Sequence, residues 1–176
     1  MLLIGILLSC GTESGSQEPI DKVVVITQPK HEAPQKGDFE QYSFGCCTDP
    51  EVTELSTLYL SLQEAMADDD SKKTTTSGAA FHQKVLSLTE AHPDLKPLSE
   101  YTRAWGIDSL KEIRLDFEEF NSAFIPFIEG FKSDEAELRI SKAFCPMAPG
   151  RWLQKNPKLL NPYYGHQMLR CGVFEE

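Results

Sequence analysis

Two cysteine–methionine pairs near the end of the sequence carry its most specific chemistry. Cys145 and Met147 form the first pair, and Met168 and Cys171 form the second pair about twenty residues later. Thiolate and thioether sulfurs are soft donors, and four of them together favour Cu(I) or a similarly soft ion. Residues i and i+2 of an extended segment point the same way, and residues i and i+3 of a helical turn share a face. If the intervening turns fold back, the four sulfurs can converge on one ion.

A disulfide is the competing interpretation of the same residues. A Cys145–Cys171 bridge would close a loop of roughly 26 residues and stabilise the fold by about 3–4 kcal/mol. Met147 and Met168 would then fill gaps in the core. His166, two residues before Met168, is a possible additional metal ligand or a surface histidine. Zinc and blue-copper sites are disfavoured, because CxxC pairs and a second nearby histidine are missing. Spacing alone leaves metal and disulfide equally open.

The first ten residues predict a lipid anchor. Residues 1–9 are almost wholly apolar and precede Cys10. This run is far shorter than the roughly twenty residues that a membrane-spanning helix needs, but it fits the core of a signal peptide. Leu7-Leu8-Ser9-Cys10 resembles the bacterial lipobox, whose cysteine receives the lipid after cleavage. We therefore expect a lipoprotein of the bacterial cell envelope, anchored in the outer membrane and facing the periplasm, where thiols tend to oxidise.

Composition excludes some classes of function. A chain of 176 residues with net charge −10 fits one domain with a tail, and its acidity argues against binding nucleic acid. Nucleophile elbows, phosphate loops, metalloprotease helices and paired carboxylates are not visible in the sequence. We therefore expect a protein that is not an enzyme.

The sequence divides into three parts. Residues 1–9 are the signal peptide, residues 10–47 are a flexible tether rich in Gly, Ser, Glu, Gln and Pro, and residues 48–176 are the folded domain. Cys46 and Cys47 are the last two residues of the predicted tether. Adjacent cysteines rarely bridge each other, because the geometry is strained, so we expect free thiols or links to another part of the domain.

Four amphipathic helices are predicted in the domain. The first starts after Thr48 or Asp49 as its cap, and its apolar stripe is Val52, Leu55, Tyr59, Leu62 and Met66. The second covers about 75–91, the third begins near 97, and the fourth follows residue 108 as its cap. Pro126 should kink or end the fourth helix. The three aspartates at 68–70 between the first two helices are typical of a solvated turn. Short connections then predict a mainly α fold, an up-down four-helix bundle.

The last forty residues change in character. Ala136, Leu138 and Ile140 alternate with charged residues and predict a strand. Prolines and glycines then punctuate the chain into turns. We expect an irregular strand-and-turn cap on the bundle, carrying the cysteine–methionine pairs.

Residues 145–172 resemble a known motif. Cys-Pro-Met-Ala at 145–148, Trp152, Asn-Pro-Tyr-Tyr-Gly at 161–165 and Met-Leu-Arg-Cys-Gly at 168–172 are similar to the signature of a bacterial extracytoplasmic domain family. That family, of unknown molecular function, occurs at the C-terminus of some copper/silver-efflux membrane-fusion (periplasmic adaptor) proteins and as free-standing lipoproteins. Residues 59–66, followed by two aspartates, also resemble its first helix. The resemblance covers roughly residues 50–174.

This resemblance implies a helical domain in heavy-metal resistance, with Cys145, Met147, Met168 and Cys171 as presumed Cu(I) or Ag(I) ligands. Trp152, Tyr163 and Tyr164 are expected to hold the loop onto the bundle. The leading hypothesis is a lipid-anchored Cu(I) chaperone, buffer or efflux accessory whose partner is a metal-efflux adaptor or another envelope protein. The alternative is a protein-interaction domain of the envelope, stapled by Cys145–Cys171 and without a metal.

Overall fold

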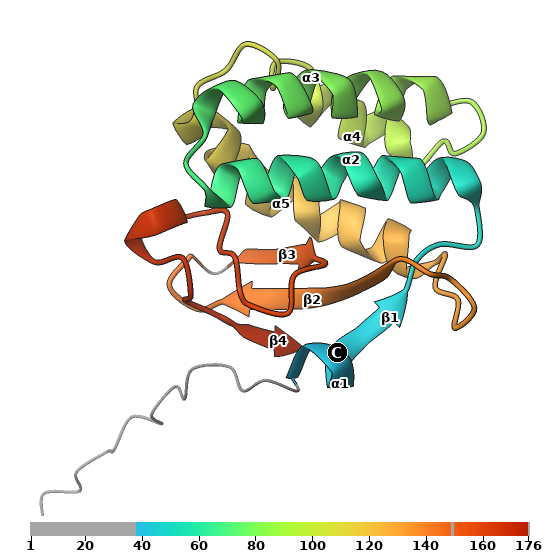
Figure 1. Cartoon of the computed structure of the whole chain (residues 1–176). Coiled ribbons are helices and arrows are strands. Elements are labelled where there is room, and N and C mark those ends of the chain that lie inside the picture. Colours follow the sequence, from blue (N-terminus) through green and yellow to red (C-terminus); the bar gives the residue numbers. More distant parts are fainter. Residues whose placement is uncertain (1–37, 149, 176) are drawn as a thin grey trace, which may run out of the picture. The chain divides into compact units, whose positions relative to one another are not determined.

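A computed structural model of the chain describes residues 38–148 and 150–175. The predicted signal peptide, Cys10 and the predicted tether up to residue 37 lie outside this range. The elements follow one another as α1 (Asp38–Tyr42), β1 (Ser43–Gly45), α2 (Pro50–Ala67), α3 (Ser71–Leu88), α4 (Leu95–Thr102), α5 (Leu110–Glu129), β2 (Arg139–Cys145), β3 (Gly150–Gln154), the 3-10 helix η1 (Gly165–Gln167) and β4 (Val173–Glu175) (Figure 1). Residues 38–45, assigned from sequence to the tether, thus form α1 and β1.

A four-stranded antiparallel sheet shows that the predicted four-helix bundle was wrong. Strand β2 pairs with β3 along one edge, and β1 and β4 follow each other along its other edge. The described residues therefore form a mixed α/β fold. Short strands hid the sheet from periodicity, because β1 and β4 have only three residues each, too few to show an alternation. The predicted strand around Ala136 and Leu138 also begins only at Arg139.

Helices α2 to α5 form a layer over one face of the sheet, with α2 and α5 against β3 (Figure 1). The buried Tyr59 of α2 joins the two layers. Its hydroxyl donates to Asn121 Oδ1 on α5 at 2.9 Å and accepts from the backbone N–H of Leu153 on β3 at 3.2 Å. Around it lies a cluster of mutually packed aromatic rings: Phe81, Trp105, Phe117, Phe120 and Phe124. This cluster gives the strands a rigid base.

Helix ends follow local capping. Asp49 caps α2 as predicted, accepting from two backbone N–H groups of the first turn. Helix α3 begins at Ser71, before the predicted position 75, because Asp70 caps it. Ser109, and not Asp108, caps α5 in a capping box with Glu112. Pro126 does not end α5, which continues to Glu129. None of the helices among the described residues has the length and apolarity to cross a membrane.

Candidate metal or redox site

The register of β2 brings Cys145 and Cys171 into contact. Cys145 is the last residue of β2 and is fully buried, and Cys171 precedes β4 and is half-buried. Because Phe144 on β2 is paired with Val173 on β4, the two cysteines meet just beyond the end of that ladder. Their Sγ atoms are 3.2 Å apart, and both cysteines are free. This distance lies between the roughly 2 Å of a disulfide and the spacing of two sulfurs on one metal ion, about 3.7 Å for tetrahedral bonds near 2.3 Å.

Asn161 fixes the loop that delivers Cys171. The residue is fully buried, and its amide Nδ2 donates to the carbonyl oxygen of Cys171 at 3.0 Å. Its Oδ1 accepts from the backbone N–H of Tyr163 at 2.9 Å and of Tyr164 at 3.3 Å. The sequence predicted turn chemistry at Asn161, and these contacts confirm it. The further contact to Cys171 makes Asn161 a positioning residue for the thiol pair.

Aromatic residues of the motif hold the loop in place, as predicted. Tyr163 packs against Phe117 of α5 and against the buried Trp152 of β3. The Tyr163 hydroxyl donates to the carbonyl oxygen of Arg151 at 2.6 Å. Tyr164 donates through its hydroxyl to the carbonyl oxygen of Met147 at 2.9 Å. These rings link the two halves of the motif.

The two methionines border the thiol pair. The backbone N–H of Cys171 donates to the Met168 carbonyl oxygen at 2.9 Å, and the backbone N–H of Met147 is near enough to the Cys171 sulfur to lower the pKa of that thiol. The Met147 side chain is 60% exposed, whereas Met168 is half-buried. The fold therefore brings all four predicted residues together at the backbone level, with the cysteine sulfurs in contact and Met147 at the surface.

Burial and the neighbouring thiol set the protonation of the pair. Burial raises the pKa of the Cys171 thiol, the hydrogen-bonded contact with Cys145 raises it further, and the Met147 N–H opposes both effects. The resulting pKa is about 11. Cys171 is therefore a protonated thiol at neutral pH, and a metal ion bound there would displace its proton.

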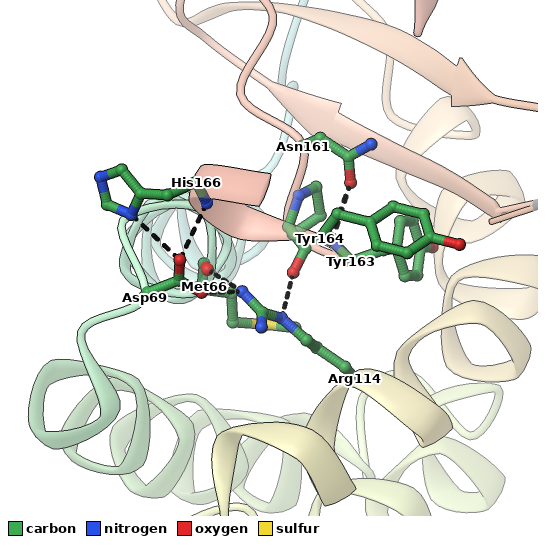
Figure 2. Close-up of polar contacts among 8 residues, drawn as sticks. Met66, Asp69, Arg114, Asn161, Tyr163, Tyr164 and His166 are labelled. Carbon is green, nitrogen blue, oxygen red and sulfur yellow. Dashed lines mark hydrogen bonds and ion pairs between the residues drawn. The ribbon is translucent and has the colours of Figure 1, made fainter. Parts of the chain in front are cut away.

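His166 engages a carboxylate instead of a sulfur. Its side chain is 65% exposed, and Asp69 Oδ2 lies 2.8 Å from its backbone N–H and 3.0 Å from its ring Nδ1 (Figure 2). Asp69 and the adjoining Gly165 both have positive φ, 56° and 53°. A Cβ on Gly165 would collide with the Asp69 carboxylate, so only glycine fits this approach.

Arg114 of α5 also contacts Asp69. The resulting clamp of His166, Asp69 and Arg114 was not predicted from the sequence. The Arg114 guanidinium lies 2.6 Å from Asp69 Oδ1 and 2.6 Å from the Met66 carbonyl oxygen, and its Nε donates to the Pro162 carbonyl oxygen at 2.7 Å (Figure 2). Asp69 is therefore a structural acceptor and not part of a merely solvated turn. Burial raises its pKa, but the hydrogen bonds from His166 and Arg114 outweigh burial and lower it to about 2.

Cys46 and Cys47 depart from expectation, because the structure joins them to each other in a disulfide. They follow β1 and precede α2. The backbone N–H of Cys46 donates to the carbonyl oxygen of Leu138 at 2.8 Å. The link to another part of the domain is thus made by the backbone, while the sulfurs bond to each other.

Within residues 38–148 and 150–175, no three or more His, Cys, Asp or Glu side chains gather as a metal-binding cluster. The candidate site therefore has two cysteines as its strong donors. A surface hollow of about 610 Å³ adjoins it, lined among others by Met147, Tyr164 and the exposed Leu115.

Comparison of the chain with protein-family models, with curated proteins and with solved structures found no match.

Proposed function

We propose that the chain is a lipid-anchored protein of the bacterial cell envelope that binds Cu(I) as its cargo, as a chaperone, buffer or efflux accessory. One observation carries the proposal: Cys145 and Cys171, far apart in sequence, present their sulfurs 3.2 Å from each other at the end of β2. The lipobox-like segment before Cys10 and the motif resemblance support the location and the metal class. An efflux adaptor or another envelope protein is the expected partner.

The residues present fit a soft monovalent ion. Two thiols in contact can each lose a proton and hold Cu(I) or Ag(I) between their sulfurs, since soft ions prefer thiolate to nitrogen or carboxylate donors. Asn161 holds the backbone of Cys171 in place, with its sulfur against that of Cys145, before any metal arrives. A site that is already assembled loses little conformational entropy on binding.

Unequal burial suggests different roles for the methionines. Met168 is half-buried and adjoins Cys171 through a backbone hydrogen bond, so it supplies the third donor. Met147 lies at the surface beside the 610 Å³ hollow, where it would meet an approaching partner that exchanges the ion. A pair of one buried and one half-buried thiol, with an exposed thioether beside it, suits transfer of cargo better than permanent storage.

Titration of the reduced full chain with Cu(I) against a competing chelator tests the proposal. We expect Cys171→Ser to lower the affinity by more than the roughly tenfold to hundredfold typical of losing an outer-shell partner. Met168→Leu should lower it less. All variants are made in the Cys46→Ser/Cys47→Ser background, because reduction opens that disulfide and its two thiols would also bind Cu(I). The background protein itself should keep the tight site. Equal affinity in the background protein and Cys171→Ser would reject the proposal.

The same sulfur contact also favours a second candidate, an envelope interaction domain stapled by a Cys145–Cys171 disulfide. Protein purified from the envelope and alkylated without reduction distinguishes the two. Complete alkylation of both cysteines supports the metal function. A stoichiometric Cys145–Cys171 bridge supports the staple.

A further inference from the structure

The Cys46–Cys47 disulfide lines a hollow that shares none of its lining residues with the proposed metal site. A space of about 340 Å³ is lined by both cysteines and by residues of two flanking segments: Thr48, Pro50, Thr53, Ala136, Glu137 and Leu138. Cys46 is fully buried, whereas Cys47 is half-buried. A reagent entering from solvent therefore reaches the Cys47 sulfur first.

A staple does not explain this disulfide. The stabilisation that a bridge provides grows with the length of the loop that it closes, and adjacent cysteines close almost none. The backbone hydrogen bond from Cys46 to Leu138 already fixes this segment to the start of β2 without help from the sulfurs. Stabilisation of the fold therefore does not account for the bond between Cys46 and Cys47.

Ser56 of α2 supplies polar support to both sulfurs. The side chain is buried, and its hydroxyl oxygen lies 3.4 Å from Cys46 Sγ and 3.6 Å from Cys47 Sγ. A disulfide sulfur has no hydrogen, so the hydroxyl is the donor in both contacts. The nearer contact is to the Cys46 sulfur, which is buried. If Cys46 leaves as a thiolate, no water can solvate its charge, and the Ser56 hydroxyl is the hydrogen-bond donor beside it.

We propose that Cys46–Cys47 is a thiol–disulfide exchange site that accepts electrons from low-molecular-weight thiols. An external thiolate attacks Cys47 Sγ, the Cys46–Cys47 bond breaks, and Cys46 leaves as a thiolate that takes a proton from water. A second external thiolate then attacks the external sulfur of the mixed disulfide. This releases the oxidised external disulfide and frees Cys47, which also takes up a proton. Two electrons and two protons thus pass from two thiols to the pair, and Ser56 stabilises the first leaving thiolate.

The test is exchange between the full chain in its oxidised form and reduced glutathione, quenched by acid and mapped by fragment mass spectrometry. We expect a glutathione adduct on Cys47 with a free thiol on Cys46. The single variants have no disulfide, so they are tested with oxidised glutathione: the Cys47 thiol of Cys46→Ser should attack it, form the adduct and release one reduced glutathione. Cys46 in the Cys47→Ser variant should stay unmodified because it is buried. Adducts on Cys46, or reaction only after unfolding in urea, would overturn the proposal.

The role of Ser56 has its own control. Ser56→Ala should slow formation of the Cys47 adduct about threefold, the effect of one modest hydrogen bond. Ser61→Ala, one to two turns further along α2, should leave the rate unchanged, because its hydroxyl bonds to the Thr57 carbonyl oxygen. Equal rates in wild type and Ser56→Ala would contradict the assigned role of Ser56.

Discussion

The two cysteine pairs lie at opposite ends of β2 and reach their partners in different ways. Cys46 and Cys47 are neighbours in sequence and are bonded near the start of the strand. Cys145 and Cys171 are 26 positions apart and only touch at its end. Seven residues of strand separate the two ends, a span of about 20 Å. Direct exchange between the pairs is therefore excluded within one folded chain.

This difference shows which pair depends on the fold. Neighbouring cysteines meet wherever the backbone between them permits it, so the fold only selects their surroundings, here Ser56 and a hollow. Cys145 and Cys171 meet because β4 pairs with β2 and because Asn161 holds the loop. Changes in the C-terminal loop should therefore disturb the second pair and leave the first untouched.

The largest expected contrast is the stability gained on oxidation. In the chain-entropy treatment, a Cys145–Cys171 bridge raises the free energy of unfolding by about 3–4 kcal/mol, whereas the Cys46–Cys47 bridge contributes about 1 kcal/mol. Urea unfolding of two variants measures each gain, with Cys10→Ser in both. One retains only Cys145 and Cys171, and the other retains only Cys46 and Cys47.

Each variant serves as its own control, because the same protein is compared oxidised and reduced. Equal gains in the free energy of unfolding in the two variants would contradict the expected difference between the two cysteine pairs. A loss of stability on oxidation of Cys145 and Cys171 would show that their 3.2 Å contact suits a metal ion better than a bridge.

The next effect concerns Asn161→Ala. This change leaves the Cys171 carbonyl oxygen and the backbone N–H groups of Tyr163 and Tyr164 without their partner, and should lower the free energy of unfolding by about 2–3 kcal/mol. Asn156→Ala is the matched control. Its side chain accepts only from the Lys158 N–H among the described contacts, and its loss should cost about 0.5–1 kcal/mol.

The reactivity of the thiols in Asn161→Ala tests whether the change affects only the Cys145–Cys171 pair. In Asn161→Ala, maleimide should label Cys171 faster than in the wild type, since the loop is released. Exchange of glutathione at Cys47 should keep its wild-type rate. A parallel change at both ends of β2 would show that the two cysteine pairs are not independent.

The sequence predicted the helices better than the strands, for physical reasons. Asp49 and the stripe of α2 are local signals, as is the turn chemistry of Asn161, and the structure confirms them. Strands β1 and β4 are too short to show a period, and their pairing with β2 is a long-range event. The convergence of Cys145 and Cys171 was predicted as a possibility, because donor chemistry is visible in sequence. The Asp69–Arg114 clamp was not, because nothing local marks residues 45 positions apart as partners.

The smallest expected effect is the acid sensitivity of the Asp69 clamp, which joins the loop before Met168 to α2 and α5. The pKa of Asp69 is about 2 in the folded protein, below its ordinary value of 3.8. A lowered pKa stabilises the fold at pH values above about 4, and this contribution is lost as the pH falls toward 2. Discounted for solvent, because the side chain is about a third exposed, it amounts to about 1 kcal/mol.

Unfolding of wild type and Asp69→Asn between pH 6 and pH 2 measures this contribution. The wild type should be more stable at pH 6, and the difference should shrink steadily below pH 4, because protonation of Asp69 mimics the variant. The exposed neighbour Asp68→Asn is the matched control, since its carboxylate makes neither the Arg114 nor the His166 contact. A difference that stays constant down to pH 2 would mean that the charge on Asp69 does not hold the loop. The bonds from the Arg114 guanidinium to the backbone carbonyl oxygens of Met66 and Pro162 would then suffice.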